Sequence, residues 1–308
     1  MAVADYVASY KNAWEVDENF YQKVEEACKT LYIESLKDLP PDVRVALEKA
    51  HEKEQLESGK DILATLIKTV STADDEKLLI CQDTGIPVYF VKVGNQVRFD
   101  GLRLEQAIRK GTERATLEHP LRSSIVNTLT RKNHGTSTGE QIPVIHYEFV
   151  EGNEIEIMIV PKGSGSENMS YLKMLTPAEG IEGIKKYVLE CVFESGANPC
   201  PPTIVGIGLG GSADKCAALA KKAAAREVGS QNPDPDVQEL EEELYTAINK
   251  MGIGAHGLGG NTTALAVQIE AADTHMTCNP VAVNMMCWPA RRMRATFKSH
   301  EAKPEITY

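Results

Sequence analysis

The sequence has no hydrophobic run that could cross a lipid bilayer. A membrane-spanning helix needs about 20 consecutive apolar residues, and no stretch of the 308 residues approaches that length. The N-terminal segment also lacks the basic stretch followed by an apolar stretch that marks a secretory signal. We therefore predict a cytoplasmic protein without a membrane partner.

The sequence has fewer basic residues than acidic ones. Lys and Arg number 33 against 44 Asp and Glu, which gives a formal net charge of −11. Binding to nucleic acid or to an anionic membrane depends on a basic surface, so we predict neither partner. A small anionic substrate is still compatible with this charge, because a local pocket can be positive on an acidic protein.

Closely spaced cysteine pairs are also absent. The seven cysteines are odd in number, and none forms a CxxC motif. A disulfide framework is not expected in a large cytoplasmic chain. Structural zinc sites usually draw on ligands that are paired closely in the sequence, so a zinc site is not expected either.

The N-terminal quarter of the chain is predicted to be helical. Apolar residues recur at helical spacing from Asp17 to Leu39 and again from Lys60 to Thr72. Between these segments, the charged run EKAHEKEQLE indicates a helix with a solvated face. Cys28 lies on the apolar face of the first helix, where packing in the core is expected. We treat residues 1–75 as a helical N-terminal region.

Residues 76–308 mix strands with helices and are predicted to form one continuous α+β region. Two hairpins are expected, one turning at Gly94-Asn95 and one across Glu151-Gly152-Asn153. Strands are also expected at TIVGIG, TTALAVQIEA and PVAVNMM. Helices are expected over residues 104–118, 121–129, 177–195, 213–228 and 237–251. This mixture indicates α+β, with a mainly antiparallel sheet flanked by helices.

Three cysteines stand next to residues that shape the backbone. Cys81 lies in CQDTG, Cys200 in NPCPP and Cys287 in CWP. Proline and glycine fix the local backbone, which suits a thiolate that is held toward a shared centre. Three widely separated thiolates fit a cubane cluster in which one iron has no protein thiolate. Burial in the core is the alternative for each of them, because buried cysteine is common.

The motifs around these cysteines occur in a distinctive order: CQDTG, PLRSSIVNTLTRKNHGT, PKGSGSENMS, NPCPPTIVGIGLGGSADK, GIGAHGLGGNTTAL and HMTCNPVAVNMMCW. From Cys81 to Arg292 the chain resembles the N-terminal half of class I (iron–sulfur) fumarate hydratases and the α subunit of their two-subunit forms. L-tartrate dehydratase α subunits are close relatives of these enzymes. The resemblance implies a hydro-lyase with a [4Fe-4S] cluster bound by Cys81, Cys200 and Cys287. Cys278 is the alternative third ligand.

The resemblance also implies residues that bind a small dicarboxylate substrate. Adding water across a double bond needs a Lewis acid, donors for the developing charge and a proton carrier. Gln82 and Asp83 would contact the substrate, with Asp83 a candidate for proton transfer. Arg122 would bind a substrate carboxylate through its guanidinium fork. From the residues alone, QDTG is a tight turn capped by Asp83, and Arg122 is a surface arginine on a helix.

A second set of candidate substrate-binding residues, Lys162, Gly163, Ser164 and Gly165, follows an apolar strand. Small residues let backbone N–H groups approach a carboxylate closely, and a mobile loop is the alternative. The loop resembles that of fumarate hydratases more than that of tartrate dehydratase α subunits, which favours fumarate and L-malate. The resemblance also makes His275, twelve residues before Cys287, a candidate for catalysis.

A dinucleotide site is the main competing interpretation. The run from Gly206 to Gly211 contains GxGxxG between a predicted strand and helix, and Glu227 stands where a ribose-binding acid is expected. Only one such unit occurs, which counts against dinucleotide binding. A non-catalytic dinucleotide- or metal-binding module is the alternative from another functional class. We expect instead that these glycines let a helix begin close to the cluster, with its positive end toward the cluster's negative charge.

Single-chain relatives continue with a C-terminal domain that, by the resemblance, adds arginine, lysine and threonine residues to the pocket. The chain stops at Tyr308 without such a region. We therefore expect a separate β subunit, in an αβ or α2β2 assembly. The expected reaction is the reversible hydration of fumarate to L-malate, with a cluster iron as Lewis acid. An L-tartrate dehydratase α subunit is the alternative within the family.

Overall fold

The computed structural model describes residues 13–299 and 301–308. The chain divides into two compact units. Of these described residues, unit 1 holds those up to Asp38 together with those within 79–162 and 291–308, and unit 2 holds residues 39–78 and 163–290. The helices predicted within residues 1–75 are therefore divided between the two units.

The described residues contain helices and strands throughout. The helices are α2 (Glu18–Lys37), α3 (Pro41–Lys53), α4 (Glu57–Glu76), α5 (Gly101–Glu118), α6 (Ser164–Glu167), α7 (Gly180–Ser195), α8 (Ala213–Ala223) and α9 (Pro235–Lys250), with 3-10 turns η2 (Pro177–Glu179) and η3 (Ala255–Gly257). The strands are β1 (Trp14–Glu15), β2 (Ile86–Gly94), β3 (Val97–Arg98), β4 (Val144–Val150), β5 (Ile155–Lys162), β6 (Ser170–Leu175), β7 (Thr203–Leu209), β8 (Ala264–Ala271), β9 (Asn279–Met286), β10 (Met293–Phe297) and β11 (Glu305–Thr307). None of these described helices is both long and apolar enough to span a membrane.

Unit 1 contains a five-stranded sheet in the order β11-β10-β5-β2-β4. β2 lies between β4 and β5, parallel to β4 and antiparallel to β5. The hairpin predicted across residues 151–153 is therefore wrong, because β4 and β5 pair with β2 and not with each other. The hairpin predicted at Gly94-Asn95 is also wrong, since β3 pairs with β1 in a separate parallel ribbon.

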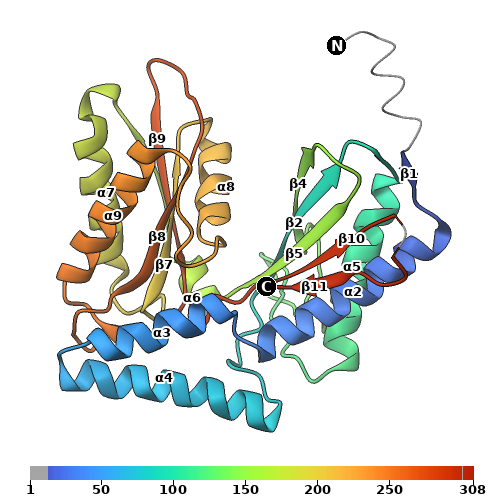
Figure 1. Ribbon diagram of the computed structural model, residues 1–308, viewed down its shortest axis with the longest axis horizontal. Coiled ribbons are helices and arrows are strands. Elements are labelled where there is room, and N and C mark those ends of the chain that lie inside the picture. The colour runs from blue at the N-terminus through green and yellow to red at the C-terminus, as the bar shows by residue number, and fades with distance from the viewer. Residues whose placement is uncertain (1–12, 300) are drawn as a thin grey trace. The chain divides into compact units, whose positions relative to one another are not determined.

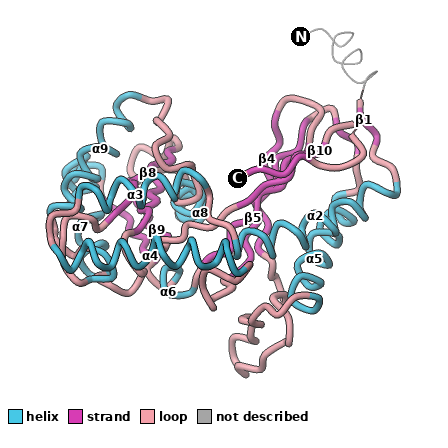
Figure 2. Tube along the Cα trace, turned by 60° about the horizontal axis from the view of Figure 1, so that its bottom comes forward, coloured by secondary structure: helices cyan, strands magenta, loops and turns pink. Residues whose placement is uncertain are grey.

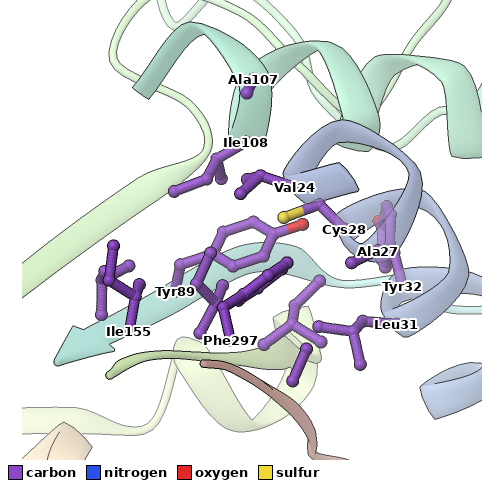
Figure 3. Packing of buried hydrophobic residues seen from close by; sticks show 14 of the residues in the cluster. Val24, Ala27, Cys28, Leu31, Tyr32, Tyr89, Ala107, Ile108, Ile155 and Phe297 are labelled. Atoms are coloured by element: carbon purple, nitrogen blue, oxygen red, sulfur yellow. The ribbon is translucent and has the colours of Figure 1, made fainter. Parts of the chain in front are cut away.

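Helices α2 and α5 pack together beside the sheet of unit 1 (Figure 1). The side chain of Asp17 begins α2 by accepting a 2.8 Å hydrogen bond from the N–H of Phe20, as a favourable N-cap does. The buried residues of α2 include Val24, Cys28 and Leu31, which lie in the core of unit 1 shown in Figure 3. The predicted first helix and the core position of Cys28 are thus confirmed.

Unit 2 contains a four-stranded sheet in the order β6-β9-β7-β8. β7 is antiparallel to β9 and parallel to β8. Helices α7 and α9 cover one face of this sheet, and α8 covers the other (Figure 1). Helices α3 and α4 run alongside each other in Figures 1 and 2, and α3 contacts β8. Unit 2 is therefore a sheet with helices on both faces.

The predicted α+β class is confirmed, but both larger sheets are mixed, since each contains one parallel pairing. The helix predicted over residues 121–129 is wrong. The side chain of Asn127 accepts hydrogen bonds from the N–H groups of Leu129 and Thr130, and such local bonds compete with helix formation. Arg122 therefore lies in a loop.

Candidate functional site

Cys200 and Cys287 flank the same end of the sheet in unit 2. β7 begins just after Cys200 and β9 ends just before Cys287, and the antiparallel register sets Ile204 opposite Met286. The N–H of Trp288 donates a 3.2 Å hydrogen bond to the carbonyl oxygen of Cys200. The structure thus brings together the segments that carry two of the three predicted ligands.

The backbone of Cys200 is held in an unusual conformation. Its φ is +55°, a left-handed value that costs free energy for a residue other than glycine and persists only where the surroundings impose it. The N–H of Cys200 donates to the carbonyl of Ala197 at 3.1 Å. Cys200 is exposed and Cys287 is partly exposed, so neither cysteine is a core residue.

Two further predicted segments reach this end of the unit 2 sheet. The loop before β8 contacts the Cys200 segment, since the N–H of His256 donates to the carbonyl of Pro201 at 2.8 Å. Gly165, in α6, lies beside the carbonyl oxygen of Asn198. Gly163 and Ser164 immediately precede Gly165, so this predicted substrate-binding group lies near the Cys200 segment. Gly163 and Gly165 are at least partly buried, while Ser164 is exposed.

In unit 1, the turn that carries Cys81, Gln82 and Asp83 immediately precedes β2. Ile86 at the start of β2 pairs with Lys162 at the end of β5, so this turn and Lys162 share one end of the unit 1 sheet. The N–H of Gly85 donates to Oδ1 of Asp83 at 2.9 Å. The tight turn expected from QDTG is therefore confirmed.

Arg122 is joined to this turn through its backbone. The hydroxyl of Thr84 donates a 2.6 Å hydrogen bond to the carbonyl of Arg122, and the hydroxyl of Tyr32 donates to the carbonyl of Thr84 at 3.1 Å. The Arg122 residue is exposed. Its guanidinium can therefore meet an anionic ligand without breaking a buried contact.

Two buried arginines were not predicted from the sequence. Arg291 and Arg292 are each 2% exposed, and Lys162 is fully buried. Arg291 donates through Nη1 to the carbonyl oxygen of Asp83 at 2.8 Å. Buried cations need compensating partners, and here one of them fixes the turn that carries Asp83. The only signal in the sequence was the Arg-Arg pair that follows the CWPA motif.

The other cysteines differ in their surroundings. Cys28, Cys191 and Cys216 are buried, and burial raises the pKa of all three thiols, to about 12 for Cys191 and about 11 for Cys216. A thiol with a raised pKa stays protonated and is a poor metal ligand or nucleophile near neutral pH.

Cys278 and His275 lie together, away from Cys287. They belong to the segment between the end of β8 and the start of β9, at the opposite end of the sheet from Cys200. The N–H of Cys278 donates to the carbonyl of His275 at 2.8 Å, and Nδ1 of His275 lies 2.9 Å from the hydroxyl of Thr277. Within unit 2, His275 therefore does not join Cys200 and Cys287, and its catalytic role stays a prediction.

The glycine run after Cys200 has a packing role. Gly206 and Gly208 lie inside β7, and a Cβ atom at Gly208 would approach the carbonyl oxygen of Cys216 to 2.0 Å. These glycines therefore let α8 pack closely on the sheet and form no phosphate-binding turn. Helix α8 also begins beyond the C-terminal end of β7, far from Cys200 along the strand. The expected approach of this helix start to the Cys200 segment is wrong.

Glu227, the expected ribose-binding acid, is held through its backbone. Its carbonyl oxygen accepts a 2.6 Å hydrogen bond from the side-chain amide of Gln268. Among the described residues, no three side chains of histidine, cysteine, aspartate or glutamate are grouped as ligands of a single metal ion.

The comparisons with known proteins agree with one another. The profile of the fumarate hydratase (Fumerase) family matches residues 25–296. A protein of Methanocaldococcus jannaschii, provisionally named L(+)-tartrate dehydratase subunit alpha, is 45% identical over 273 residues, covering 88% of this chain and 96% of that protein. The L(+)-tartrate dehydratase alpha subunits of Escherichia coli O157:H7 and Shigella sonnei are each 36% identical over 255 residues, covering 82% of this chain and 84% of each relative.

Proposed function

Because the chain belongs to the fumarate hydratase (Fumerase) family, we propose that it is the α subunit of an iron–sulfur hydro-lyase. Its proposed substrates are fumarate and L-malate, which it interconverts by adding or removing water. The observation that carries this proposal is the hydrogen bond from the N–H of Trp288 to the carbonyl of Cys200. That bond joins the segments of two of the three cysteines that resemble cluster ligands.

In this proposal Cys81, Cys200 and Cys287 hold a [4Fe-4S] cluster and leave one iron without a protein thiolate. The chemistry of the donors supports the choice, since these three cysteines are exposed or partly exposed. Three of the remaining cysteines, in contrast, have raised thiol pKa values. When bound, the cluster supplies a Lewis-acidic iron for a substrate oxygen.

The carboxylates of the substrate are bound by other groups of this chain. Arg122 offers a planar guanidinium that suits a carboxylate bidentately. Gly163, Ser164 and Gly165 offer backbone N–H groups at the start of α6, where the first turn of a helix leaves such donors without intrahelical partners. Lys162, whose side chain is buried, adds a positive charge to this set, and a local positive potential favours a dianion.

Proton transfer is assigned to Asp83, with Gln82 beside it as a donor of hydrogen bonds to the substrate. A proton carrier must be held within hydrogen-bond reach of the reacting group. The contact of Arg291 with the Asp83 carbonyl supports such an orientation. His275 is a candidate by the resemblance alone, and we assign it no step because it lies at the opposite end of the unit 2 sheet from Cys200.

L(+)-tartrate is the second candidate substrate, because the relatives from M. jannaschii and E. coli carry that name. Both reactions add or remove water at carbon atoms next to carboxylates, so the same binding groups would serve either substrate. The test is a comparison of kcat/KM for L-malate, fumarate and L(+)-tartrate under anaerobic conditions. A higher value for L-malate and fumarate supports the first assignment, and a higher value for tartrate replaces it.

We further propose that turnover requires a separate β subunit, since the relatives are named as alpha subunits. The chain would be purified anaerobically both alone and after co-expression with a candidate β subunit. We expect the cluster in both preparations and hydration of fumarate only in the second. Full activity of the chain alone would contradict this division.

A further inference from the structure

Glu54 is a buried carboxylate in a segment that the sequence marks as a solvated face. The residue is 2% exposed, although Lys53 and Gln55 on either side of it are exposed. The predicted solvated face is thus wrong at this position. Burying an ionised carboxylate is costly unless hydrogen bonds compensate, so the partners of Glu54 show what it holds in place.

The partners of Glu54 are backbone N–H groups. Oε1 accepts from Gln55 at 2.9 Å and from Leu56 at 3.1 Å. The N–H of Asn261 lies 3.0 Å from Oε1 and 2.9 Å from Oε2. Burial alone would raise the pKa of Glu54, but the N–H groups of Asn261, Leu56 and Gln55 outweigh it and lower the pKa. The ionised carboxylate therefore ties the start of α4 to a distant segment.

That segment is the glycine loop, which we define as residues 252–263 (GIGAHGLGGNTT). Its Gly260 has a φ of +113°, and a Cβ atom there would lie 2.8 Å from Oε2 of Glu54. Only glycine adopts this backbone readily and leaves room for the carboxylate. The glycine loop is thus shaped to receive Glu54.

The other side of the glycine loop contacts the residues around Cys200. The N–H of His256 donates to the carbonyl of Pro201 at 2.8 Å. Gly257 lies directly against Ala197. The glycine loop therefore touches the chain both before and after Cys200, whose left-handed backbone needs external support.

We propose that Glu54 is a positioning residue for Cys200, acting through the glycine loop. The inference rests on the proposed function, in which Cys200 is a cluster ligand. The carboxylate holds the loop, and the loop holds Ala197 and Pro201 on either side of the cysteine. Loss of the carboxylate frees the loop and lets the Cys200 segment relax toward ordinary backbone angles.

The test uses the full chain and the variant Glu54→Gln. Glutamine keeps the size of the side chain but sets an NH2 group against backbone N–H donors. Hydrogen exchange is measured by mass spectrometry on cluster-free protein. We expect exchange in residues 197–203 to accelerate about tenfold, which corresponds to about 1.4 kcal/mol. Residues 272–278, at the other end of the same sheet, should exchange as in the wild type.

Glu57→Gln is the matched control, because Glu57 is an exposed glutamate three residues further on. It should leave exchange unchanged in both segments. A second readout is the visible circular dichroism of the reconstituted cluster, which reports the arrangement of the thiolates around it. This spectrum should change in Glu54→Gln and not in Glu57→Gln.

Unchanged exchange in residues 197–203 of Glu54→Gln would overturn the proposal. If exchange in Glu54→Gln accelerates in residues 272–278 as well, the same exchange experiment on Gly260→Ala distinguishes a local effect from a general one. The added methyl group of this variant presses on the carboxylate of Glu54 from the side of the glycine loop. Local acceleration in Gly260→Ala supports the positioning role, whereas no change or acceleration throughout unit 2 overturns it. Since exchange is measured without the cluster, a failure here is distinct from a failure to find iron in the wild type.

Discussion

The carbonyl oxygen of Cys200 accepts a 3.2 Å hydrogen bond from the N–H of Trp288, the residue that follows Cys287. The bond follows from the antiparallel pairing of β7 and β9, which sets Ile204 opposite Met286. It distinguishes the two cysteines that compete to be the third ligand. Cys287 lies next to the Cys200 segment, whereas Cys278 lies at the far end of β9.

This relationship predicts different outcomes for Cys287→Ser and Cys278→Ser. The first should abolish assembly of the cluster, because it removes a thiolate beside Cys200. The second should retain iron and sulfide at the wild-type level. Both are measured by iron and acid-labile sulfide analysis after anaerobic purification. Loss of the cluster in Cys278→Ser with retention in Cys287→Ser would mean that the third ligand is misassigned.

Arg291→Lys should lower kcat with little change in iron content. Lysine keeps the charge, but its shorter side chain cannot place the ammonium where Nη1 of arginine lies, so the hydrogen bond to the carbonyl of Asp83 is weakened. If Asp83 transfers a proton, we expect kcat to fall about tenfold, or about 1.4 kcal/mol in the barrier. Steady-state kinetics of the αβ enzyme measure the effect.

Arg294→Lys is the control for this substitution, since Arg294 lies in β10 close to Arg291 in sequence and pairs with Glu156 at 3.8 Å. It should keep kcat close to the wild-type value. Equal losses in both variants would indicate general damage to unit 1 and no specific role for Arg291.

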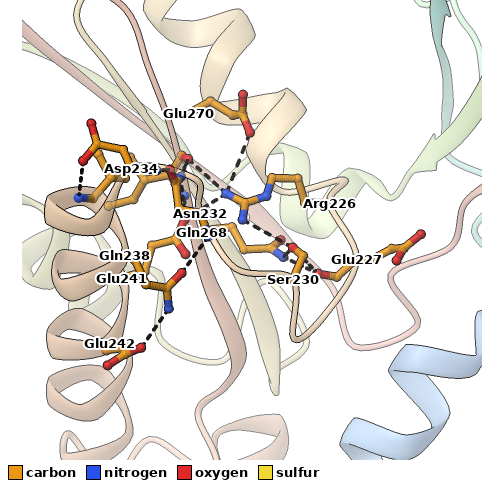
Figure 4. A network of polar contacts seen from close by, with 12 residues as sticks. Arg226, Glu227, Ser230, Asn232, Asp234, Gln238, Glu241, Glu242, Gln268 and Glu270 are labelled. Atoms are coloured by element: carbon orange, nitrogen blue, oxygen red, sulfur yellow. Dashed lines mark hydrogen bonds and ion pairs between the residues drawn. The ribbon is translucent and has the colours of Figure 1, made fainter.

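Glu241→Gln should destabilise unit 2. Glu241 is 4% exposed, and its Oε1 accepts from Arg226 at 2.8 Å and from the N–H of Ile269 at 2.7 Å (Figure 4). Losing the negative charge weakens a charge-assisted bond to a mostly buried arginine, so the free energy of unfolding should fall by about 2 kcal/mol. Urea denaturation measures this change.

The neighbouring exposed Glu239 provides the comparison. Glu239→Gln should stay within about 0.5 kcal/mol of the wild type, as surface substitutions usually do. If both glutamines cost the same, the network in Figure 4 contributes nothing specific to stability.

Cys191 should make the protein less stable in alkali. Burial raises the pKa of its thiol from the ordinary 9.0 to about 12. Above pH 9 the unfolded chain loses the thiol proton while the folded chain keeps it, so the free energy of unfolding falls as pH rises. This contribution is fully present below pH 9 and is lost as pH rises toward 12.

Cys191→Ala removes this titration, so its stability should fall less steeply from about pH 8 to about pH 10 than that of the wild type. Thermal denaturation across this range measures both slopes. Identical slopes would show that the thiol titrates alike in the folded and unfolded chains.

Local signals in the sequence were sufficient for most helices. The helical spacing of apolar residues such as Val24, Cys28 and Leu31 predicted a helix from Asp17 to Leu39, and the structure has α2 from Glu18 to Lys37. Strand pairing could not be predicted in the same way. The segments on either side of residues 151–153 have the pattern of a hairpin, but β2 inserts between β4 and β5. Nothing local encodes that insertion.

In the candidate site, too, local motifs predicted individual residues, but contacts between distant parts of the chain could not be predicted. Cys200 and Cys287 were found from their proline-containing motifs, and their adjacency depends on the register of β7 and β9. Arg291 and Glu54 were missed, because a charged residue in a polar sequence is normally exposed. Their burial depends on partners far along the chain, Asp83 and Asn261.

The most direct test of the account is iron and acid-labile sulfide analysis of the wild-type chain purified under strict anaerobiosis. A [4Fe-4S] cluster held by Cys81, Cys200 and Cys287 predicts about four irons and four sulfides per chain. Zinc in place of iron, or iron without sulfide, would contradict it.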